Sequence, residues 1–174
     1  MKRTLSNQYP RLTLIMCLSL LLNACGSYDI TVNERLVYNA ESLFTDYTVE
    51  DARLQTCIDQ TIKDQGITSA AQLARLSCSD AGISQLKGIG TFSRLSALNL
   101  RNNHLTSIAE LGTLSELREL IVAENQLKEA SAILTLLKLE QVDLRANPKL
   151  HCRELKQFVS YSSAHIQAPN HCSL

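Results

Sequence analysis

The sequence predicts an α/β solenoid: a short right-handed coil of parallel β-strands whose convex side is irregular or 3₁₀-helical, with a helical cap at each end. Two observations carry this prediction. Leucine and isoleucine return in the same order every 22 residues between residues 73 and 150, and asparagine returns in register with them at Asn103, Asn125 and Asn147. A fixed period of this length indicates stacked units, each of which buries its apolar face against the next.

The repeat is clearest in residues 95–117, LSALNLRNNHLTSIAELGTLSEL. Its apolar positions are Leu95, Leu98, Leu100, Leu105, Ile108, Leu111, Leu114 and Leu117. The next copy continues with Leu120, Val122, Leu127, Ala130, Ile133 and Leu136, and a third begins with Leu139, Val142 and Leu144. The preceding copy contains Leu73, Leu76, Cys78, Ile83, Leu86, Ile89 and Phe92, with Ala81 in the asparagine position.

Each part of the repeat has a structural interpretation. The segment L-x-x-L-x-L alternates near its end, which indicates a short strand with one buried face. The asparagine follows where the chain leaves the strand, and there a side-chain amide can hydrogen-bond backbone groups that lack a strand partner. Apolar residues at every third position then indicate a 3₁₀-like convex segment.

This pattern resembles the leucine-rich-repeat family, specifically its 22-residue class, which is shared with bacterial internalins. The resemblance covers residues 72–150 and implies a concave face lined by the strands. The alternative is a bundle of amphipathic helices built from the same leucines. The apolar spacing drifts from 3.6 residues, and the asparagines recur in register, so the solenoid is favoured.

The N-terminus is typical of an exported protein. Lys2, Arg3 and Arg11 precede an apolar run over residues 12–22, which is too short to cross a bilayer as a stable helix. The four residues that end in Cys25, LNAC, resemble the bacterial lipoprotein box, which implies cleavage after residue 24 and lipidation of Cys25. Gly26, and not aspartate, follows the cysteine, and the resemblance to Gram-negative lipoproteins then implies sorting to the outer membrane. The alternatives are a plain signal peptide and an uncleaved anchor.

The remaining chain divides into four predicted parts. Residues 25–47 form an N-terminal tether, with strand-like pieces at 30–32 and 36–38 that Asn33 and Glu34 could join as a hairpin. Residues 48–72 form a helical cap, with Thr48 and Asp51 as its capping pair and Gly66 as its stop. Residues 73–150 are the repeats. Residues 151–174 form a helix–strand cap, in which Tyr161, Ala164 and Ile166 continue the strand positions and Pro169 replaces the asparagine.

Four cysteines remain after Cys17 leaves with the signal and Cys25 is lipidated, and an even number in an exported chain predicts disulfides. Three pairings are formally possible. The repeat register favours one of them, because Cys57 lies on the cap helix above Cys78, and Cys172 lies in the tail that returns over Cys152. We therefore expect Cys57–Cys78 and Cys152–Cys172, one bridge in each cap.

Chemistry at other sites has little support. His151, His165 and His171 accompany the last two cysteines, but their spacing does not match a zinc motif, so we expect no metal and no cofactor. Cys78 and His104 could be imagined as a nucleophile and its base, but Cys78 falls on a core position. No catalytic signature appears, so we expect no enzyme. Without residues 1–24 the chain has 14 basic and 17 acidic residues, which is not the charge of a nucleic-acid-binding protein.

The surface that remains is the row of outward strand positions, where solenoids usually bind partners. These positions hold Arg75, Ser77, Ser79, Ala97, Asn99, Arg101, Glu119, Ile121, Ala123, Gln141, Asp143 and Arg145. Ile121 is the one large apolar residue among them, and Asn99, Arg101, Glu119, Asp143 and Arg145 surround it; an apolar centre with a charged rim is typical of a modest protein interface. The alternative is ordinary solvated strand residues that pair across strands, such as Arg101 with Asp143.

The leading hypothesis is therefore a monomeric, lipid-anchored envelope module on the periplasmic face of the outer membrane or on the cell surface. It would bind a protein partner through its concave face. The second hypothesis is a structural or carbohydrate-contacting envelope component. No outward strand position carries the aromatic side chain on which a sugar could stack, which disfavours that second hypothesis.

Overall fold

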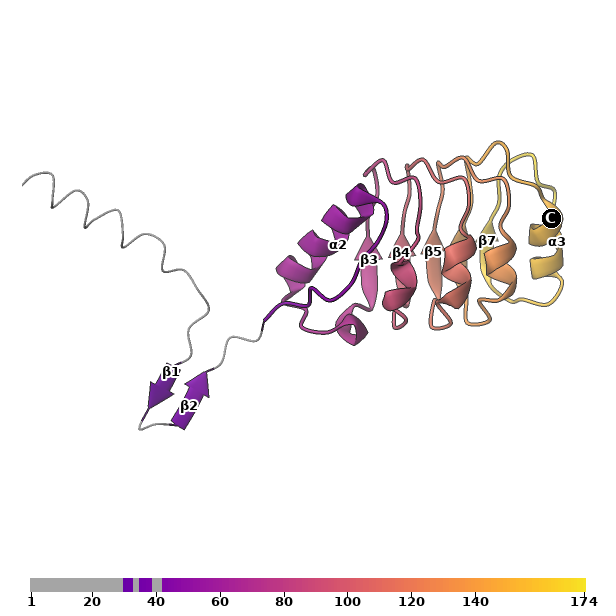
Figure 1. Ribbon diagram of the computed structural model, residues 1–174. Helices are drawn as coiled ribbons and strands as arrows, with labels where there is room; N and C mark the ends of the chain where they lie inside the picture. Colours follow the sequence, from indigo (N-terminus) through magenta and orange to yellow (C-terminus); the bar gives the residue numbers. More distant parts are fainter. Residues whose placement is uncertain (1–29, 33–34, 39–41) are drawn as a thin grey trace, which may run out of the picture. The chain divides into compact units, whose positions relative to one another are not determined.

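The computed structural model describes residues 30–32, 35–38 and 42–174 (Figure 1). The predicted signal sequence and Cys25 lie outside these residues. The chain divides into two compact units, Met1–Ser42 and Leu43–Leu174. In the first unit, β1 (Ile30–Val32) pairs antiparallel with β2 (Arg35–Tyr38), at the positions predicted for a hairpin.

The second unit is a coil of five parallel strands in chain order (Figure 1). The strands are β3 (Arg75–Ser77), β4 (Ala97–Asn99), β5 (Glu119–Ile121), β6 (Gln141–Asp143) and β7 (His165–Gln167). Their register follows the predicted period, since Leu76 lies beside Leu98, Leu98 beside Leu120, and Leu120 beside Val142. The parallel solenoid is therefore present as the repeat predicts.

The last turn of the coil departs from that period. Val142 lies beside Ile166, not beside Ala164 as the 22-residue period predicts, so the last turn is two residues longer. The convex side of this turn is formed by α3 (Arg153–Val159) in place of a 3₁₀ turn. The helix keeps the period, because its buried residues Leu155 and Phe158 lie 22 residues after the buried Ile133 and Leu136, so the two extra residues lie between α3 and β7.

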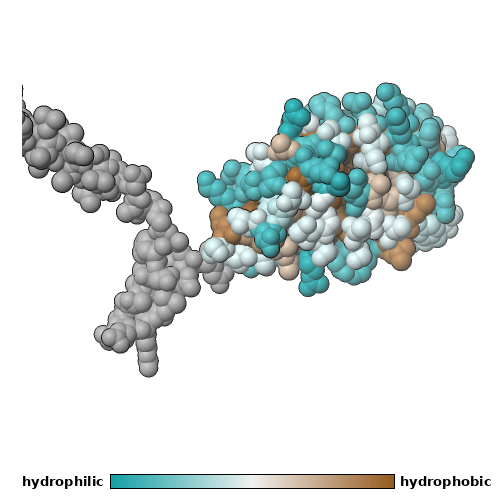
Figure 2. All heavy atoms as spheres, viewed as in Figure 1, coloured by the Kyte–Doolittle hydropathy of each residue, from teal (hydrophilic) through white to brown (hydrophobic). Residues whose placement is uncertain are grey.

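The convex side of the earlier turns is built from short 3₁₀-helices. These are η2 (Ala70–Gln72), η3 (Ile89–Thr91), η4 (Ala109–Thr113) and η5 (Ser131–Leu134). The leucines at every third position point inward from them and meet the inward residues of the strands. The result is one continuous core from Val49 to Cys172. The face seen in Figure 2 is mostly hydrophilic, as expected for a chain that buries its leucines in this way.

Asparagine side chains connect one turn of the coil to the next. In each case Oδ1 accepts a backbone N–H of the preceding turn, and Nδ2 donates to carbonyls of both turns. For Asn125 these partners are the Leu105 amide at 3.0 Å and the Leu100 and Val122 carbonyls at 3.0 and 3.1 Å. Asn103 and Asn147 repeat the arrangement, which is the role that the sequence predicts for them.

The residue before each asparagine position has a left-handed backbone. Asp80, Asn102, Glu124 and Ala146 have φ between 52° and 59°, and they follow one another at the period of the repeat. Asparagine and aspartate tolerate this conformation, but glutamate and alanine carry a steric cost. The turn is therefore imposed by the coil and not by the residue.

The N-terminal cap is the helix α2 (Ala52–Gln65), which buries Leu54, Ile58 and Ile62 and ends at Gly66 in the left-handed conformation. Its N-cap is Asp51 alone, so the predicted capping pair with Thr48 is wrong. The reason is that Asp51 is buried and makes every capping contact itself: Oδ1 accepts the amides of Arg53 and Leu54, and Oδ2 accepts the amide and the hydroxyl of Ser84, both at 2.8 Å.

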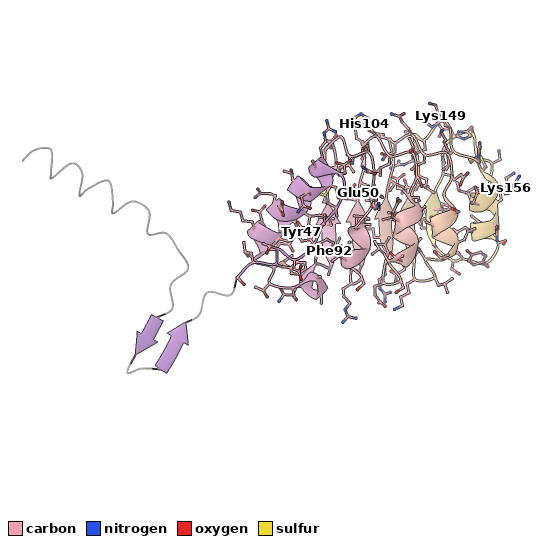
Figure 3. The ribbon with its side chains drawn as sticks, viewed as in Figure 1. Tyr47, Glu50, Phe92, His104, Lys149 and Lys156 are labelled. Atoms are coloured by element: carbon pink, nitrogen blue, oxygen red, sulfur yellow. A yellow bond between two sulfur atoms is a disulfide. The ribbon has the colours of Figure 1, made fainter. Side chains whose placement is uncertain are left out.

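An aromatic cluster includes two residues that lie ahead of the predicted start of the cap at residue 48. The Tyr47 ring lies beside that of Phe92 (Figure 3), with centroids 5.0 Å apart. The Phe44 ring lies 5.7 Å from that of Tyr47. The Tyr47 hydroxyl donates to Asp59 of α2 at 2.6 Å. Burial, and to a smaller extent this hydrogen bond, raises the pKa of the Tyr47 phenol above its ordinary value. Gly88 allows the backbone at Thr48 to lie close against the coil, since a Cβ at residue 88 would lie 2.2 Å from the Thr48 carbonyl oxygen.

Each cap contains one disulfide. Cys57 of α2 is bonded to Cys78 at the end of β3, with Cα atoms 5.9 Å apart. Cys152, which precedes α3, is bonded to Cys172 in the tail after β7, with Cα atoms 5.4 Å apart. These are the two pairs that the repeat register predicts.

Candidate functional site

The candidate site is the concave face, formed by the outward residues of β3 to β7 and the residues that follow the strands. The strand register places these residues in parallel rows. One row contains Arg75, Ala97, Glu119, Gln141 and His165, and the next contains Ser77, Asn99, Ile121, Asp143 and Gln167. The predicted partner-binding residues Asn99, Arg101, Glu119, Ile121, Asp143 and Arg145 are thus brought together on one surface.

Ile121 occupies the middle of this surface. It lies on the central strand β5, beside Asn99 on one side and Asp143 on the other, and its side chain is partly exposed. The side chain of each neighbour is held by the backbone two residues further along the chain. Asn99 Oδ1 accepts the Arg101 amide at 3.0 Å, and Asp143 Oδ1 accepts the Arg145 amide at 3.1 Å. The polar residues around Ile121 are therefore fixed before any partner arrives.

Asp143 and Arg145 form the most completely bonded charge pair of the surface. Arg145 Nε donates to Asp143 Oδ1 at 2.9 Å, and Nη2 donates to Oδ2 at 2.7 Å. Burial of the Asp143 carboxyl acts to raise its pKa, but the hydrogen bonds and the positive charge of Arg145 outweigh it, so the pKa lies below the ordinary value. Asp143 is consequently ionised at neutral pH and holds Arg145 in place.

The other charges of the surface are paired as well. Arg101 forms an ion pair with Glu124, not with Asp143 as the cross-strand alternative suggests. Arg75 reaches across the small, buried Ala97 to Glu119, with Nη2 3.3 Å from Oε2. Arg75, Arg101 and Arg145, the arginines of the concave face, therefore each have a carboxylate partner.

The arginine is nonetheless the more exposed member of each pair. The Arg145 side chain is 55% exposed and that of Asp143 is 11% exposed. The same order holds for Arg75 and Glu119, at 73% and 36%, and for Arg101 and Glu124, at 51% and 40%. The concave face thus exposes more of its arginine side chains than of their carboxylate partners.

The surface contains two hollows that meet at Ile121. The first hollow has a volume of about 430 Å³ and is lined by Thr61, Gln65, Arg75, Leu76, Ser77, Ala97, Leu98, Asn99, Glu119 and Ile121. The second hollow has a volume of about 290 Å³ and is lined by Asn99, Arg101, Leu120, Ile121, Gln141, Val142, Asp143, Arg145, His165 and Gln167. No phenylalanine, tyrosine or tryptophan lines either hollow.

Some residues of this surface were not predicted from the sequence. Glu124 was missed because it lies beyond the strand, although its left-handed backbone turns it toward Arg101. His165 and Gln167 were missed because the predicted surface included only the outward positions of the first four strands. The 22-residue period carried on from Asp143 and Arg145 is the signal that could have identified them.

The other sequence candidates are placed away from a reactive arrangement. Cys78 is joined to Cys57, so its sulfur is not available as a nucleophile that His104 could activate as a base. The ligand atoms of Cys152, His171 and Cys172 lie within 4.8 Å of one another, but both sulfurs belong to the disulfide. Within the described residues, no helix has the length and apolar character needed to cross a membrane.

A second exposed feature was also missed. Leu137 is 81% exposed, at the position that serine occupies in the two preceding repeats, Ser93 and Ser115. It lines a depression of about 560 Å³ together with Tyr161, which is 52% exposed. The substitution of leucine for serine at one repeat position is the signal that could have identified it.

The parallel strands, the asparagine-linked turns and the 3₁₀ convex side together define the fold of leucine-rich-repeat proteins. No protein-family profile matches the chain, and no curated protein matches it in sequence. Among solved structures it is similar to internalin C2 (inlC2) of Listeria monocytogenes, with a TM-score of 0.57 and 23% identity over 68% of this chain and 53% of that one. It is also similar to an internalin (inlF) of the same organism, with a TM-score of 0.51 and 24% identity over 55% of this chain and 30% of that one. The chain thus spans about half or less of the length of these neighbours.

Proposed function

We propose that this chain is a lipid-anchored envelope protein that binds another protein through its concave face. The observation that carries the proposal is the partly exposed Ile121 at the centre of a preordered polar surface, between two hollows. Interfaces of this kind concentrate their energy on a few central residues. The internalin-like fold supports a binding module in general.

Anchoring is proposed from the sequence alone, through lipidation of Cys25. Acyl chains on this residue would supply membrane affinity. Cys25→Ser should abolish membrane association and labelling by radioactive palmitate, while Cys17→Ser, in the predicted signal, should change neither. Normal labelling of Cys25→Ser would refute the anchor.

The concave face is tested by crosslinking in intact cells. Ile121→Asp places a charge at the centre of the surface without touching the core, so it should remove the crosslinked partner and leave the melting temperature nearly unchanged. Leu137→Asp is the matched control, since it introduces the same charge at an exposed leucine outside the concave face. Arg145→Glu should also reduce capture.

Capture of the same partner at the same yield by Ile121→Asp and Arg145→Glu would exclude the concave face. Loss of capture by Leu137→Asp alone would instead place the binding surface near α3. The carbohydrate alternative predicts retention on a glycan array, and the absence of aromatic residues in both hollows weighs against it.

A further inference from the structure

We infer that the second hollow binds a carboxylate of the partner through Arg145 and Arg101, beside an apolar partner side chain that packs on Ile121. This inference rests on the proposed function, because it names the chemistry of the segment that occupies the concave face. Three observations support it: the geometry of Arg145, the greater exposure of the arginines than of their carboxylate partners, and the size of the hollow.

Arg145 retains a free set of donors. A guanidinium has five N–H groups in one plane, and Asp143 uses the Nε–H and one N–H of Nη2. The remaining edge, formed by Nη1 and the second N–H of Nη2, meets no acceptor in the described part of the chain. Two parallel N–H groups at this edge match the two oxygens of a carboxylate, which is the bidentate geometry that makes arginine selective for such groups.

Asp143 makes this edge ready for binding. It contacts Arg145 through both carboxylate oxygens and through the backbone amide, so the long side chain is already ordered in the free protein. Ordering an arginine on binding usually costs part of the interaction free energy, and here that cost is met during folding. Asp143 is therefore a positioning residue for Arg145, and its buried carboxylate is not itself a contact for the partner.

The surroundings favour an acidic group over a basic one. Arg101 lines the same hollow. Between the two arginines lies Ala123, which follows β5 and has a small, buried side chain. Asp143 and Glu124, whose charge also acts on Arg145, balance the two arginines in number, but each is less exposed than the arginine with which it pairs. More of the exposed side-chain surface therefore belongs to the arginines, which favours an acidic partner group.

The size of the hollow suits a side chain of the partner. Its volume of about 290 Å³ lies at the lower limit of the range of about 300–1,000 Å³ that is typical of small-molecule pockets. Ile121 lies in both hollows, so an apolar side chain beside the acid would find its contact there. The recognised element is thus a short segment with an acidic residue next to an apolar one.

The test is a random-peptide display selection on residues 43–174. This part contains the whole described core, from Val49 to Cys172, and both disulfides, so it can fold alone. Selected peptides should be enriched in aspartate or glutamate close to an apolar residue. Arg145→Gln should weaken their binding about 10- to 100-fold, since hydrogen bonds to a charged group are lost. Arg145→Lys should lose part of this affinity, because it keeps the charge but not the fork.

Two controls assign the effect. Arg118→Gln alters an arginine of similar exposure that is paired with Glu140 outside the second hollow, and it should leave affinity unchanged. Replacing the acidic residue of the peptide by its amide should reduce affinity as Arg145→Gln does, and combining the two changes should add no further loss.

The outcomes separate this inference from the proposed function. Peptides that lose binding with Ile121→Asp, but lack acidic residues or ignore Arg145→Gln, would overturn the carboxylate site and leave the concave face as the binding surface. Peptides that ignore Ile121→Asp, or a selection that enriches none, would overturn both.

Discussion

At the scale of the residue, the side chain of Asp51 joins the N-terminal helix to the coil. Its two oxygens accept hydrogen bonds from the first turn of α2 and from Ser84, which lies more than a full turn of the coil away in sequence. Burial acts to raise the pKa of this carboxyl, but the bonds from Ser84, Leu54 and Arg53 outweigh it, and the pKa lies below its ordinary value. The ionised form is therefore favoured in the folded protein.

This shift predicts a pH dependence of stability. Because the folded pKa is lower than the unfolded value of about 3.9, Asp51 stabilises the fold above that pH and loses its contribution as the pH falls through the folded pKa. Asp51→Asn should cost about 1–3 kcal/mol at pH 7 and show a smaller further loss between pH 5 and pH 3 than the wild type. Thermal melting at each pH measures both effects, and parallel curves for the two proteins would contradict the assignment.

Ala146 provides a second prediction at this scale. It has a φ of 54°, which costs a residue with a Cβ roughly 1–2 kcal/mol, whereas glycine adopts this conformation freely. Ala146→Gly should stabilise the protein by about 0.5–1 kcal/mol after the larger unfolded-state entropy of glycine is included. Denaturant unfolding measures the difference. Ala109→Gly, in the 3₁₀-helix η4 and without a positive φ, is the control and should destabilise.

These residues also show where sequence reasoning ends. The asparagines were predictable because they recur with the period, and recurrence reveals a role that each copy repeats. Asp51 and Glu124 act through contacts that occur once, with Ser84 and with Arg101, and a single contact leaves no periodic trace. The outward rows of the concave face were predictable for the same reason as the asparagines, but the ion pairs across it were not.

At the scale of the element, the caps are the parts that depend on covalent bonds. The coil between them is held by strand pairing on both sides of each turn, but α2 and the tail after β7 have neighbours on one side only. The two disulfides span 21 and 20 residues of sequence. A loop of this length corresponds to about 3 kcal/mol in the chain-entropy description of a disulfide.

Removal of either bridge should therefore be measurable. The paired change Cys152→Ser and Cys172→Ser should cost about 2–4 kcal/mol, and Cys57→Ser with Cys78→Ser should cost a similar amount. Denaturant unfolding measures the cost, and peptide mapping without reductant identifies the bonds in the native protein. Free thiols or crossed pairs in that map would refute the pairing, and a stability equal to that of the wild type would refute the stabilising role.

The strands illustrate what a period can predict about elements. β3 to β6 lie where the 22-residue repeat places them, because the connections that separate them are equal in total length. β7 is displaced because the connection between α3 and β7 is two residues longer than its counterparts in the earlier turns, whereas Leu155 and Phe158 of α3 still follow the period. A longer connection after the convex segment thus becomes a change of register on the concave side.

At the scale of the whole molecule, the arrangement predicts a gradient of local stability. Each turn is stabilised by the turns beside it, so those in the middle have two neighbours and the last one has a single neighbour. Backbone amides of β4 and β5 should exchange with deuterium more slowly than those of β7, and reduction of the Cys152–Cys172 bridge should widen the difference. Native-state hydrogen exchange tests this, and equal protection along the coil would contradict it.

The regular spacing of β3 to β6 also has a consequence for how such a chain can change its length. Each of these turns contacts only the turns beside it and repeats the same asparagine bonds, so a duplicated unit has matching surfaces on both sides. A gene with residues 95–116 copied in tandem would encode a protein with one more strand, both caps unchanged and a broader concave face. The last turn, which contains α3 and is two residues longer, does not repeat this unit, so duplication is expected to lengthen the middle of the coil.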